Sequence, residues 1–320
     1  MRTVACVVLG IGFRAMGTRE GTGDKMADIS APFKMPMLEE LDFSKSPVIF
    51  HYCSLETFLS IVQYKSLRLS DINTMNDYSE MHWAYDRFIE AVNQLIDEYD
   101  VEYFEYLDKL VSEAQLHTLP LLSCFSTDGD VLSQWRAYAD DGMGVAVGFD
   151  SAIMASLAIR CAPVTYDPEL QVGFFRDLIA ATFPMWKIGD VKDNSHLAKF
   201  LTRAVFDMCL MKNPAFAEEK EVRIARAVVV RHDGDGWHLE DAGGKGSDKS
   251  SGKKHPIKYR AKKGGLVAHI DLPFSGAGPK FIKEVVLGPR SANKGTEISM
   301  ALNANGLKGS KIRLSTATYR

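Results

Sequence analysis

The segment EEKEVRIAR carries charged residues two positions apart at Glu219, Glu221 and Arg223. This alternation predicts a strand on which the three side chains share one face, while Val222 and Ile224 enter a core. Two carboxylates placed so closely repel each other and tend to raise the pKa of one of them, which suits acid–base chemistry. A solvated strand face with a salt bridge explains the same spacing, and the spacing alone favours that plainer interpretation.

A second polar group ends the short apolar run VIFHYCS, at His51, Tyr52 and Ser54. All three side chains carry groups that bind ligands. Ser54 also has the right type and place to cap a helix, because apolar residues recur at helical spacing from Phe58 to Val62. A lone histidine near a strand end is more often structural. No second histidine or carboxylate stands nearby at the spacing of metal ligands, so the sequence predicts no metal site.

A third group follows the buried strand LPLLSCFS, where Trp135 and Tyr138 lie three residues apart on a predicted short helix. That spacing places both rings on one helix face, where aromatic side chains most often belong to the core. The alternative is an aromatic wall that stacks against a ring of a ligand. The chain contains no G-x-S-x-G, P-loop or G-x-G-x-x-G motif, and no strand precedes GMGVAVG in the order that a dinucleotide fingerprint requires.

Composition describes a globular chain of 320 residues, 46% hydrophobic and 25% charged, with a net charge of -3. This balance gives no overall attraction to nucleic acid or to membranes. Residues 245–263 are the exception, because they contain eight basic residues and a single acidic residue, Asp248. This predicted loop could contact nucleic acid, so that partner is not excluded. The five cysteines are scattered without a C-x-x-C pair, which indicates reduced thiols and a cytoplasmic protein.

The first 46 residues are predicted to be a disordered leader, since residues 14–34 are rich in Gly, Thr and Lys without any period. The apolar run TVACVVLGIGF is short and Arg14 follows it directly, which disfavours a signal peptide. Translation from Met26 or Met35 is an alternative explanation of this leader. No segment approaches the roughly 20 apolar residues of a membrane span.

The remaining chain, residues 47–320, is predicted to be one α+β domain with mixed, mainly antiparallel sheets that form a central cleft. Strand runs include 48–52, 121–125, 145–149 and 222–228. Helical periodicity marks two insertions near 78–118 and 169–211. Residues 231–265 are predicted to form a long loop or a splayed hairpin.

Four stretches together resemble the bacterial family known as domain of unknown function 2971. They follow one another over about residues 47–290 and read HYCSLETFLSIVQYKSLRLSDINTMNDYSE, LLSCFSTDGDVLSQWRAYADDGMGVAVGFD, NPAFAEEKEVRI and IKEVVLGPRS. In YRAKKGGLVAHIDL, a further element of that family, AH stands where a Pro-aromatic pair is expected. The family has no assigned activity, so this resemblance leaves the function open.

A second resemblance supplies chemistry. FHYCSLETFLSIVQYKSL is similar to the first strand and helix of ADP-ribosyltransferase-like domains, and EEKEVRI is similar to the Glu-x-Glu that opens their catalytic strand. Ser66-Leu67 departs from the expected Gly-Leu. The resemblance implies NAD as a substrate and no permanently bound cofactor, with a macromolecular acceptor that the sequence does not identify.

The same resemblance implies roles for individual residues. His51 is expected to bond the nicotinamide ribose, and Glu221 to bond the ribose 2′-hydroxyl and stabilise an oxocarbenium-like transition state. Tyr52 or Trp135 is expected to stack the nicotinamide, with Ser54 beside it. Glu219 or Arg223 is expected to orient the acceptor.

Three function classes follow from these patterns. The first is an NAD-consuming enzyme of the ADP-ribosyltransferase type, in phage defence or a toxin system. The second is a non-catalytic sensor module that binds a nucleotide or peptide in the same cleft. The third is a nuclease using Glu219, Glu221 and Asp150, although no spacing typical of metal ligands supports it. A cleft that contains both His51 and Glu221 together with aromatic side chains favours the enzyme.

Overall fold

The computed structural model describes residues 38–74, 80–188, 195–244, 252–262 and 264–319. Their architecture is the predicted α+β fold, with an open and mainly antiparallel sheet. Residues 1–37 lie outside the described part of the chain, and so do residues 245–251 of the basic segment. Among the described residues, no helix has the length and apolar character needed to cross a membrane.

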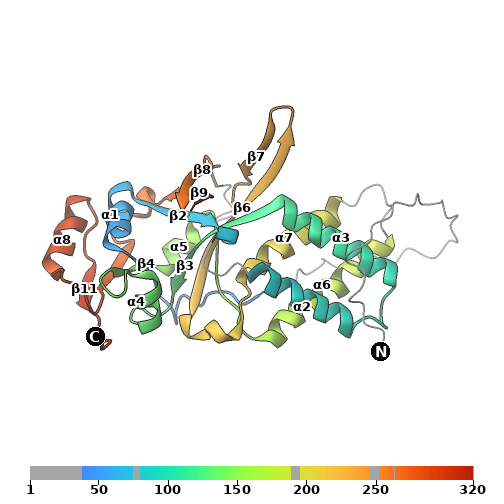
Figure 1. The fold of residues 1–320 in the computed structure, drawn as a ribbon, viewed down its shortest axis with the longest axis horizontal. Helices are drawn as coiled ribbons and strands as arrows, with labels where there is room; N and C mark the ends of the chain where they lie inside the picture. Colours follow the sequence, from blue (N-terminus) through green and yellow to red (C-terminus); the bar gives the residue numbers. More distant parts are fainter. Residues whose placement is uncertain (1–37, 75–79, 189–194, 245–251, 263, 320) are drawn as a thin grey trace.

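One branched sheet runs through the molecule (Figure 1). Every strand pair is antiparallel except the pair of β10 with β11. The main path is β11 (Lys311–Leu314), β10 (Ile282–Leu287), β4 (Val145–Asp150), β1 (Val48–Cys53), β3 (Thr118–Ser126), β2 (Ser66–Asp71), β9 (Gly265–Pro273) and β8 (Lys258–Lys262). The branch carries β6 (Glu221–Asp233), β5 (Arg160–Pro163) and β7 (Gly236–Asp241).

The branch point is strand β3. Strand β6 pairs with the whole length of β3, from Thr118 to Ser126, and so occupies one of the two edges of β3. Strands β1 and β2 therefore share the other edge: β1 meets β3 at Ser126, while β2 meets it at Leu121 and Leu122. Between those two points no strand of the described chain pairs with residues 123–125 on that edge. The sheet opens there.

Helix α1 (Leu55–Tyr64) connects the two strands that separate at this opening. Its apolar face, with Phe58, Ile61 and Val62, is buried. The predicted cap is confirmed, because the Ser54 side chain accepts a hydrogen bond of 3.2 Å from the Thr57 amide.

Four long helices pack together on one side of the sheet, at the right of Figure 1. They fall within the segments 78–118 and 169–211, where helical periodicity was strong. They are α2 (Glu80–Gln94), α3 (Val101–His117), α6 (Pro168–Ile188) and α7 (Ser195–Asp207). The shorter helices are α4 (Leu132–Tyr138), α5 (Ser151–Ser156) and α8 (Gly295–Ala304).

Strands β3 and β6 separate two hydrophobic cores. Leu122 and Ala225 turn toward the four long helices and join their core. Val222 and Ile224 turn to the opposite face, as predicted, and join the core of the sheet. Because side chains alternate along a strand, Glu221 and Arg223 lie on the helix-facing side.

Two boundaries differ from the sequence prediction. Leu38 and Leu41 are buried, so packed structure begins before Pro47 and the segment 38–46 is not a disordered leader. Within 231–265, strand β6 continues to Asp233 and pairs with β7 as a regular hairpin. Strand β8 then takes the end of the basic segment into the sheet.

Candidate functional site

A groove of about 1340 Å³ lies along the open edge of β3. Ser123, Cys124 and Phe125 line it where the sheet separates, and helix α1 contributes Thr57 and Ser60. The groove extends in one direction over β2, β9 and β8. In the other direction it reaches Glu80 at the beginning of α2 and residues 212–223.

His51 bridges the opening of the sheet. Its Nδ1 lies 2.9 Å from the carbonyl oxygen of Cys124, on the edge of β3 that no described strand occupies. A carbonyl only accepts, so Nδ1 carries the proton. Burial lowers the pKa of His51, which keeps the imidazole neutral near pH 7 and leaves Nε2 as an acceptor. The histidine in this apolar strand therefore satisfies a carbonyl that has no strand partner on that edge.

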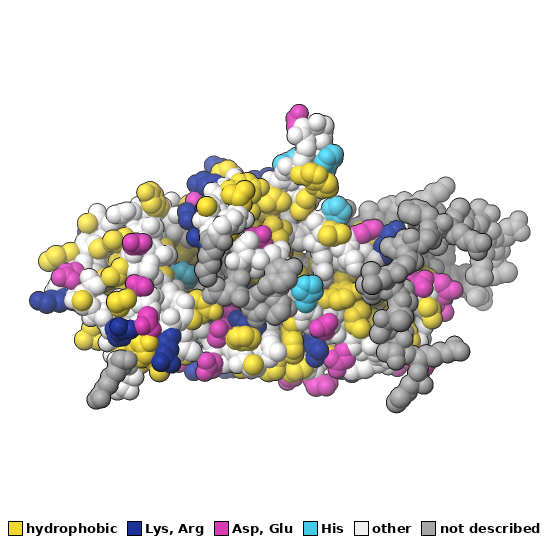
Figure 2. Space-filling model, viewed as in Figure 1, with side chains coloured by type: hydrophobic (Ala, Val, Ile, Leu, Met, Phe, Trp, Pro, Cys, Tyr) yellow, Lys and Arg dark blue, Asp and Glu magenta, His cyan; other side chains and the backbone are white. Residues whose placement is uncertain are grey.

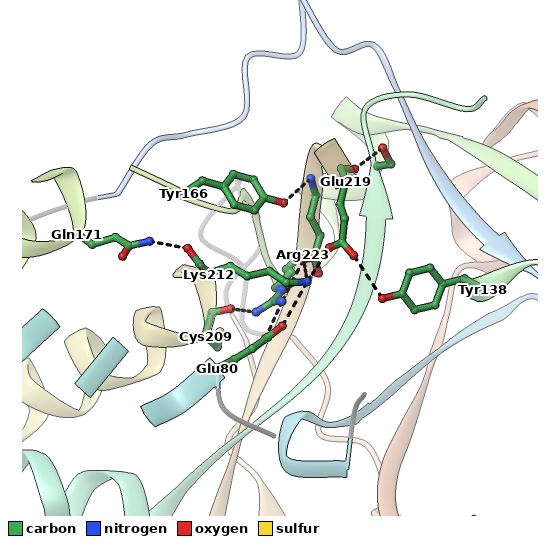
Figure 3. A network of polar contacts seen from close by, with 10 residues as sticks. Glu80, Tyr138, Tyr166, Gln171, Cys209, Lys212, Glu219 and Arg223 are labelled. Carbon is green, nitrogen blue, oxygen red and sulfur yellow. Dashed lines mark hydrogen bonds and ion pairs between the residues drawn. The ribbon is translucent and has the colours of Figure 1, made fainter. Parts of the chain in front are cut away.

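Five charged side chains form a buried network at the other end of the groove (Figure 3). Arg223 holds Glu221 with two contacts, of 2.7 Å from Nε and 3.0 Å from Nη2. The same Nη2 lies 2.7 Å from Glu80. Lys212 Nζ contacts three carboxylates, at 2.6 Å from Glu219, 3.1 Å from Glu221 and 3.3 Å from Glu80.

Burial and ion pairing act differently on the carboxyl groups of this network. Burial disfavours the charged form of Glu221, but Arg223 and Lys212 outweigh it and lower its pKa to about 2. For Glu80, burial outweighs the same two cations and raises the pKa. Of Glu80 and Glu221, Glu80 is therefore the one that holds a proton more readily. The raised carboxyl pKa that the acidic repeat predicted thus belongs to Glu80, a residue outside that repeat.

Two side chains at this end of the groove, Lys212 and Cys124, remain protonated and so are poor nucleophiles. Burial lowers the pKa of Lys212, but Glu221 and Glu80 outweigh it and raise the pKa above its ordinary value, so the ammonium stays charged. Burial raises the pKa of the Cys124 thiol well above its ordinary value, which keeps the sulfur protonated. Neither Lys212 nor Cys124 therefore offers a deprotonated nucleophile in this groove.

The prediction of one strand face for Glu219, Glu221 and Arg223 is wrong for Glu219. Glu219 ends a 3-10 turn over Pro214–Glu219, and Lys220 then adopts a left-handed conformation with φ of 46° before β6 begins. The two carboxylates still meet, through Lys212. The Glu219 side chain is 12% exposed against 4% for Glu221, and the Tyr138 hydroxyl lies 3.4 Å from it. Glu219 is therefore the more accessible carboxylate.

The expected stacking role of Trp135 does not fit the structure. Its ring is fully buried, donates through Nε1 to Asp130 over 2.8 Å, and contacts Tyr52 edge-on at 4.8 Å. The Tyr52 hydroxyl donates to the Asp128 carbonyl and accepts from the Val131 amide, so this polar group is occupied although Tyr52 lines the groove. Trp135 is a core residue.

Two further candidates lie apart from the groove. Ser54 is the helix cap described above and is not among the lining residues. Asp150 caps α5 by accepting from the Ile153 amide, and pairs with Lys283 at 3.0 Å. The three carboxylates of the nuclease hypothesis are thus not assembled. Within the described part of the chain, no group of His, Cys, Asp and Glu could hold a metal ion.

Sequence reasoning missed Glu80 and Lys212. An acidic residue in the first turn of a helix is ordinary, because it suits the helix dipole, so Glu80 carries no signal of its own. Lys212 directly follows the apolar run MCLM before an Asn-Pro turn, and a lysine beside buried residues is a weak hint that it needs a carboxylate. The aromatic side chains that flank this end, Trp83, Tyr138 and Phe216, come from three separate elements.

Residues 134–224 match the model of a family described as Protein of unknown function (DUF2971). The matched segment runs from α4 to the beginning of β6, so it includes Lys212, Glu219, Glu221 and Arg223. The resemblance to this family is thereby supported over that segment. No curated protein and no solved structure gave a significant match to the chain. These comparisons give no support to the resemblance to ADP-ribosyltransferase-like domains.

Proposed function

We propose that the groove binds NAD and that the protein breaks the bond between nicotinamide and ribose. One observation carries this proposal: His51 from β1 and the carboxylates of Glu219 and Glu221 line the same groove, together with Phe125 and other aromatic rings. Residues far apart in the sequence meet here because β3 leaves an edge open between β1 and β2.

The roles of the two carboxylates differ from those that the sequence suggested. Glu221 is held by Arg223 and Lys212 and serves to position the network. Glu219 is the accessible carboxylate, so it is assigned to stabilise the positive charge that develops on the ribose as nicotinamide leaves. The neutral His51, with Nε2 as an acceptor, is assigned to a ribose hydroxyl.

The proposed step balances without any bound cofactor. The bond between ribose C1′ and the nicotinamide nitrogen breaks, and its electron pair leaves with nicotinamide. A water oxygen then bonds to C1′ and releases one proton to solvent, which gives ADP-ribose. If a macromolecule supplies the nucleophile instead, ADP-ribose becomes attached to that acceptor.

Glu219→Gln tests the proposal, because it keeps the shape of the side chain and removes its charge. Loss of one such electrostatic partner is expected to lower kcat for nicotinamide release about a hundredfold. Glu218→Gln is the matched control, since Glu218 is the exposed neighbour and does not line the groove. His51→Ala is expected to act chiefly through a higher KM. Equal kcat values for Glu219→Gln and Glu218→Gln would contradict the assignment.

Binding without turnover is a second candidate, favoured by the 2.6 Å contact that holds Glu219 to Lys212. In that case the groove acts as a nucleotide or peptide sensor. Saturable NAD binding with no nicotinamide release would support this candidate over the enzyme.

Depletion of NAD stops growth, so the enzyme would suit a toxin system or phage defence. Overexpression of the wild-type chain is then expected to slow growth, and Glu219→Gln to relieve the effect. Equal growth inhibition by both chains would mean that the toxicity does not arise from NAD depletion.

A further inference from the structure

The face of β2, β9 and β8 that turns toward the groove is polar and basic. Residues paired across neighbouring strands point to the same face, and the register pairs Arg68 with Asp271 and Lys258 with His269. Side chains two residues apart on β8 continue this face as Arg260 and Lys262. The opposite face buries Leu67, Leu69, Ile270 and Leu272 in the core of the sheet.

This face carries four basic side chains and the carboxylate of Asp271, which two of the four contact. Asp271 accepts from Arg68 Nε at 2.9 Å and from Lys258 Nζ at 3.0 Å. Arg68, Lys258, Arg260, Lys262 and Asp271 all line the groove, and Figure 2 shows Lys and Arg side chains gathered over β8 and β9. Positive charge therefore exceeds negative charge at this end of the groove.

Two buried nitrogen atoms of the same face lack a partner. Arg260 Nε and His269 Nδ1 are buried and make no hydrogen bond within the described part of the chain. The His269 side chain is almost wholly inaccessible, at 4% exposure. Buried polar atoms are rarely left unsatisfied in folded proteins. Of these two residues only Arg260 lines the groove, so only its guanidinium group is in place to meet a ligand there.

We propose that this basic face binds the diphosphate group of a nucleotide. Guanidinium and ammonium groups are the usual protein partners of phosphate oxygens, and Arg68, Lys258 and Arg260 all line the groove. The basic face and the His51–Glu219 region belong to one groove, so a dinucleotide that places its phosphates over β8 extends a ribose toward His51. The inference rests on the proposed function for the identity of the nucleotide.

A free nucleotide fits this face better than a nucleic acid backbone. Asp271 lies between Arg68 and Lys258, and its carboxylate would repel a phosphate chain that ran along the whole face. The net charge of -3 also gives the molecule no long-range attraction for a polyanion. A compact diphosphate that reaches Arg260 avoids both penalties.

Calorimetric titration of the full chain with inorganic pyrophosphate, ADP-ribose and adenosine tests this inference without any turnover. Pyrophosphate and ADP-ribose are expected to bind, and adenosine to bind at least about tenfold more weakly than ADP-ribose. Arg260→Gln and Lys258→Gln should each raise the dissociation constant for ADP-ribose about tenfold or more. Lys311→Gln is the charge-matched control, since Lys311 is exposed on β11 and outside the groove.

Each alternative outcome overturns a defined part of the inference. Failure of the wild-type chain to bind pyrophosphate and ADP-ribose would remove the phosphate site. Unchanged affinity in Arg260→Gln and Lys258→Gln would place it elsewhere. Tighter binding of a single-stranded oligonucleotide than of ADP-ribose, lost in the same variants, would replace the nucleotide by nucleic acid. ADP-ribose binding that depends on Arg260, without NAD turnover, would leave this site standing and refute the proposed function.

Discussion

Glu221 and Glu80 bind the same two cations, yet loss of the Glu221 charge is expected to destabilise the fold much more than loss of the Glu80 charge. Glu221→Gln leaves Arg223 and Lys212 buried with too little negative charge, which typically destabilises a fold by about 3 kcal/mol. We expect the melting temperature to fall by about 4 to 5 °C, because the entropy of unfolding grows with chain length. Glu80→Gln replaces a carboxyl group that burial already inclines to hold its proton, so it should lower the melting temperature much less. Equal losses in the two variants would contradict the opposite directions of the two pKa shifts.

The pH dependence of stability follows from the same two groups. The folded-state pKa of Glu221 is lowered from 4.5 to about 2, so its stabilising contribution is present above pH 4.5 and is lost as the pH falls toward 2. The pKa of Glu80 is raised, so its contribution is present at low pH and is lost as the pH rises through the folded-state pKa. Denaturant titrations should show the deficit of Glu221→Gln shrinking toward low pH. The stability of Glu80→Gln relative to the wild type should increase toward high pH. A difference from the wild type that stays constant with pH in both variants would contradict these pKa shifts.

Sequence patterns identified His51, Glu219 and Glu221 as candidates, because histidine at a strand end and alternating charges are visible in one dimension. They misjudged Trp135, since an aromatic ring has the same sequence signature whether it packs in a core or faces a ligand. Glu80 and Lys212 carried almost no signal. Their importance comes from Arg223 and Glu221, which only the packing of the helices against β6 brings near.

Among the elements, two features form the site. Strand β1 pairs with β4, and β1 and β2 contact β3 at separate points. Strand β4 pairs with all six residues of β1, and Gly144 precedes β4 at the end of this ladder. A Cβ atom on Gly144 would lie 2.2 Å from the Cys53 carbonyl oxygen and 3.0 Å from that of Ala139. The glycines of GMGVAVG thus include one that allows two backbones to approach closely. The sequence showed the glycines and the strand that follows, but not this contact.

Gly144→Ala is therefore expected to destabilise the protein by about 2 kcal/mol or more, because backbone atoms must move to admit the methyl group. Gly276→Ala is the control, since a Cβ atom at Gly276 meets nothing within 4 Å. Its effect should stay within about 0.5 kcal/mol. Chemical denaturation of both variants gives the two values. Similar stability of the two variants would mean that β1 and β4 tolerate a wider separation.

At the scale of the whole molecule, strands β3 and β6 join two cores that bury different faces of the same sheet. The predicted fold class and mainly antiparallel pairing emerged from local periodicity alone. The branching of the sheet at β3 did not, because pairing between strands far apart in sequence leaves no local pattern. The expected central cleft was right in kind, and its position became known only from the register of β1 and β2 on β3.

The segment before β1 links both cores, and this gives a test of where packed structure begins. Leu38 contacts the helical core, whereas Leu41 contacts the core of the sheet. Leu38→Ala and Leu41→Ala should each cost about 2 kcal/mol or more in the free energy of unfolding. Phe43→Ala is the control, because its side chain is 41% exposed. If all three variants unfold like the wild type, residues 38–46 behave as the leader that composition suggested.

Nicotinamide release from NAD by the purified wild-type chain is the decisive measurement for the proposed reaction. The account predicts release that saturates with NAD concentration and proceeds without added metal, with one nicotinamide formed for each ADP-ribose released or attached to an acceptor. At a temperature well below the melting transition of each variant, Glu219→Gln should reduce this rate about a hundredfold and Glu218→Gln should leave it unchanged. A wild-type chain that neither binds NAD nor releases nicotinamide would contradict the account.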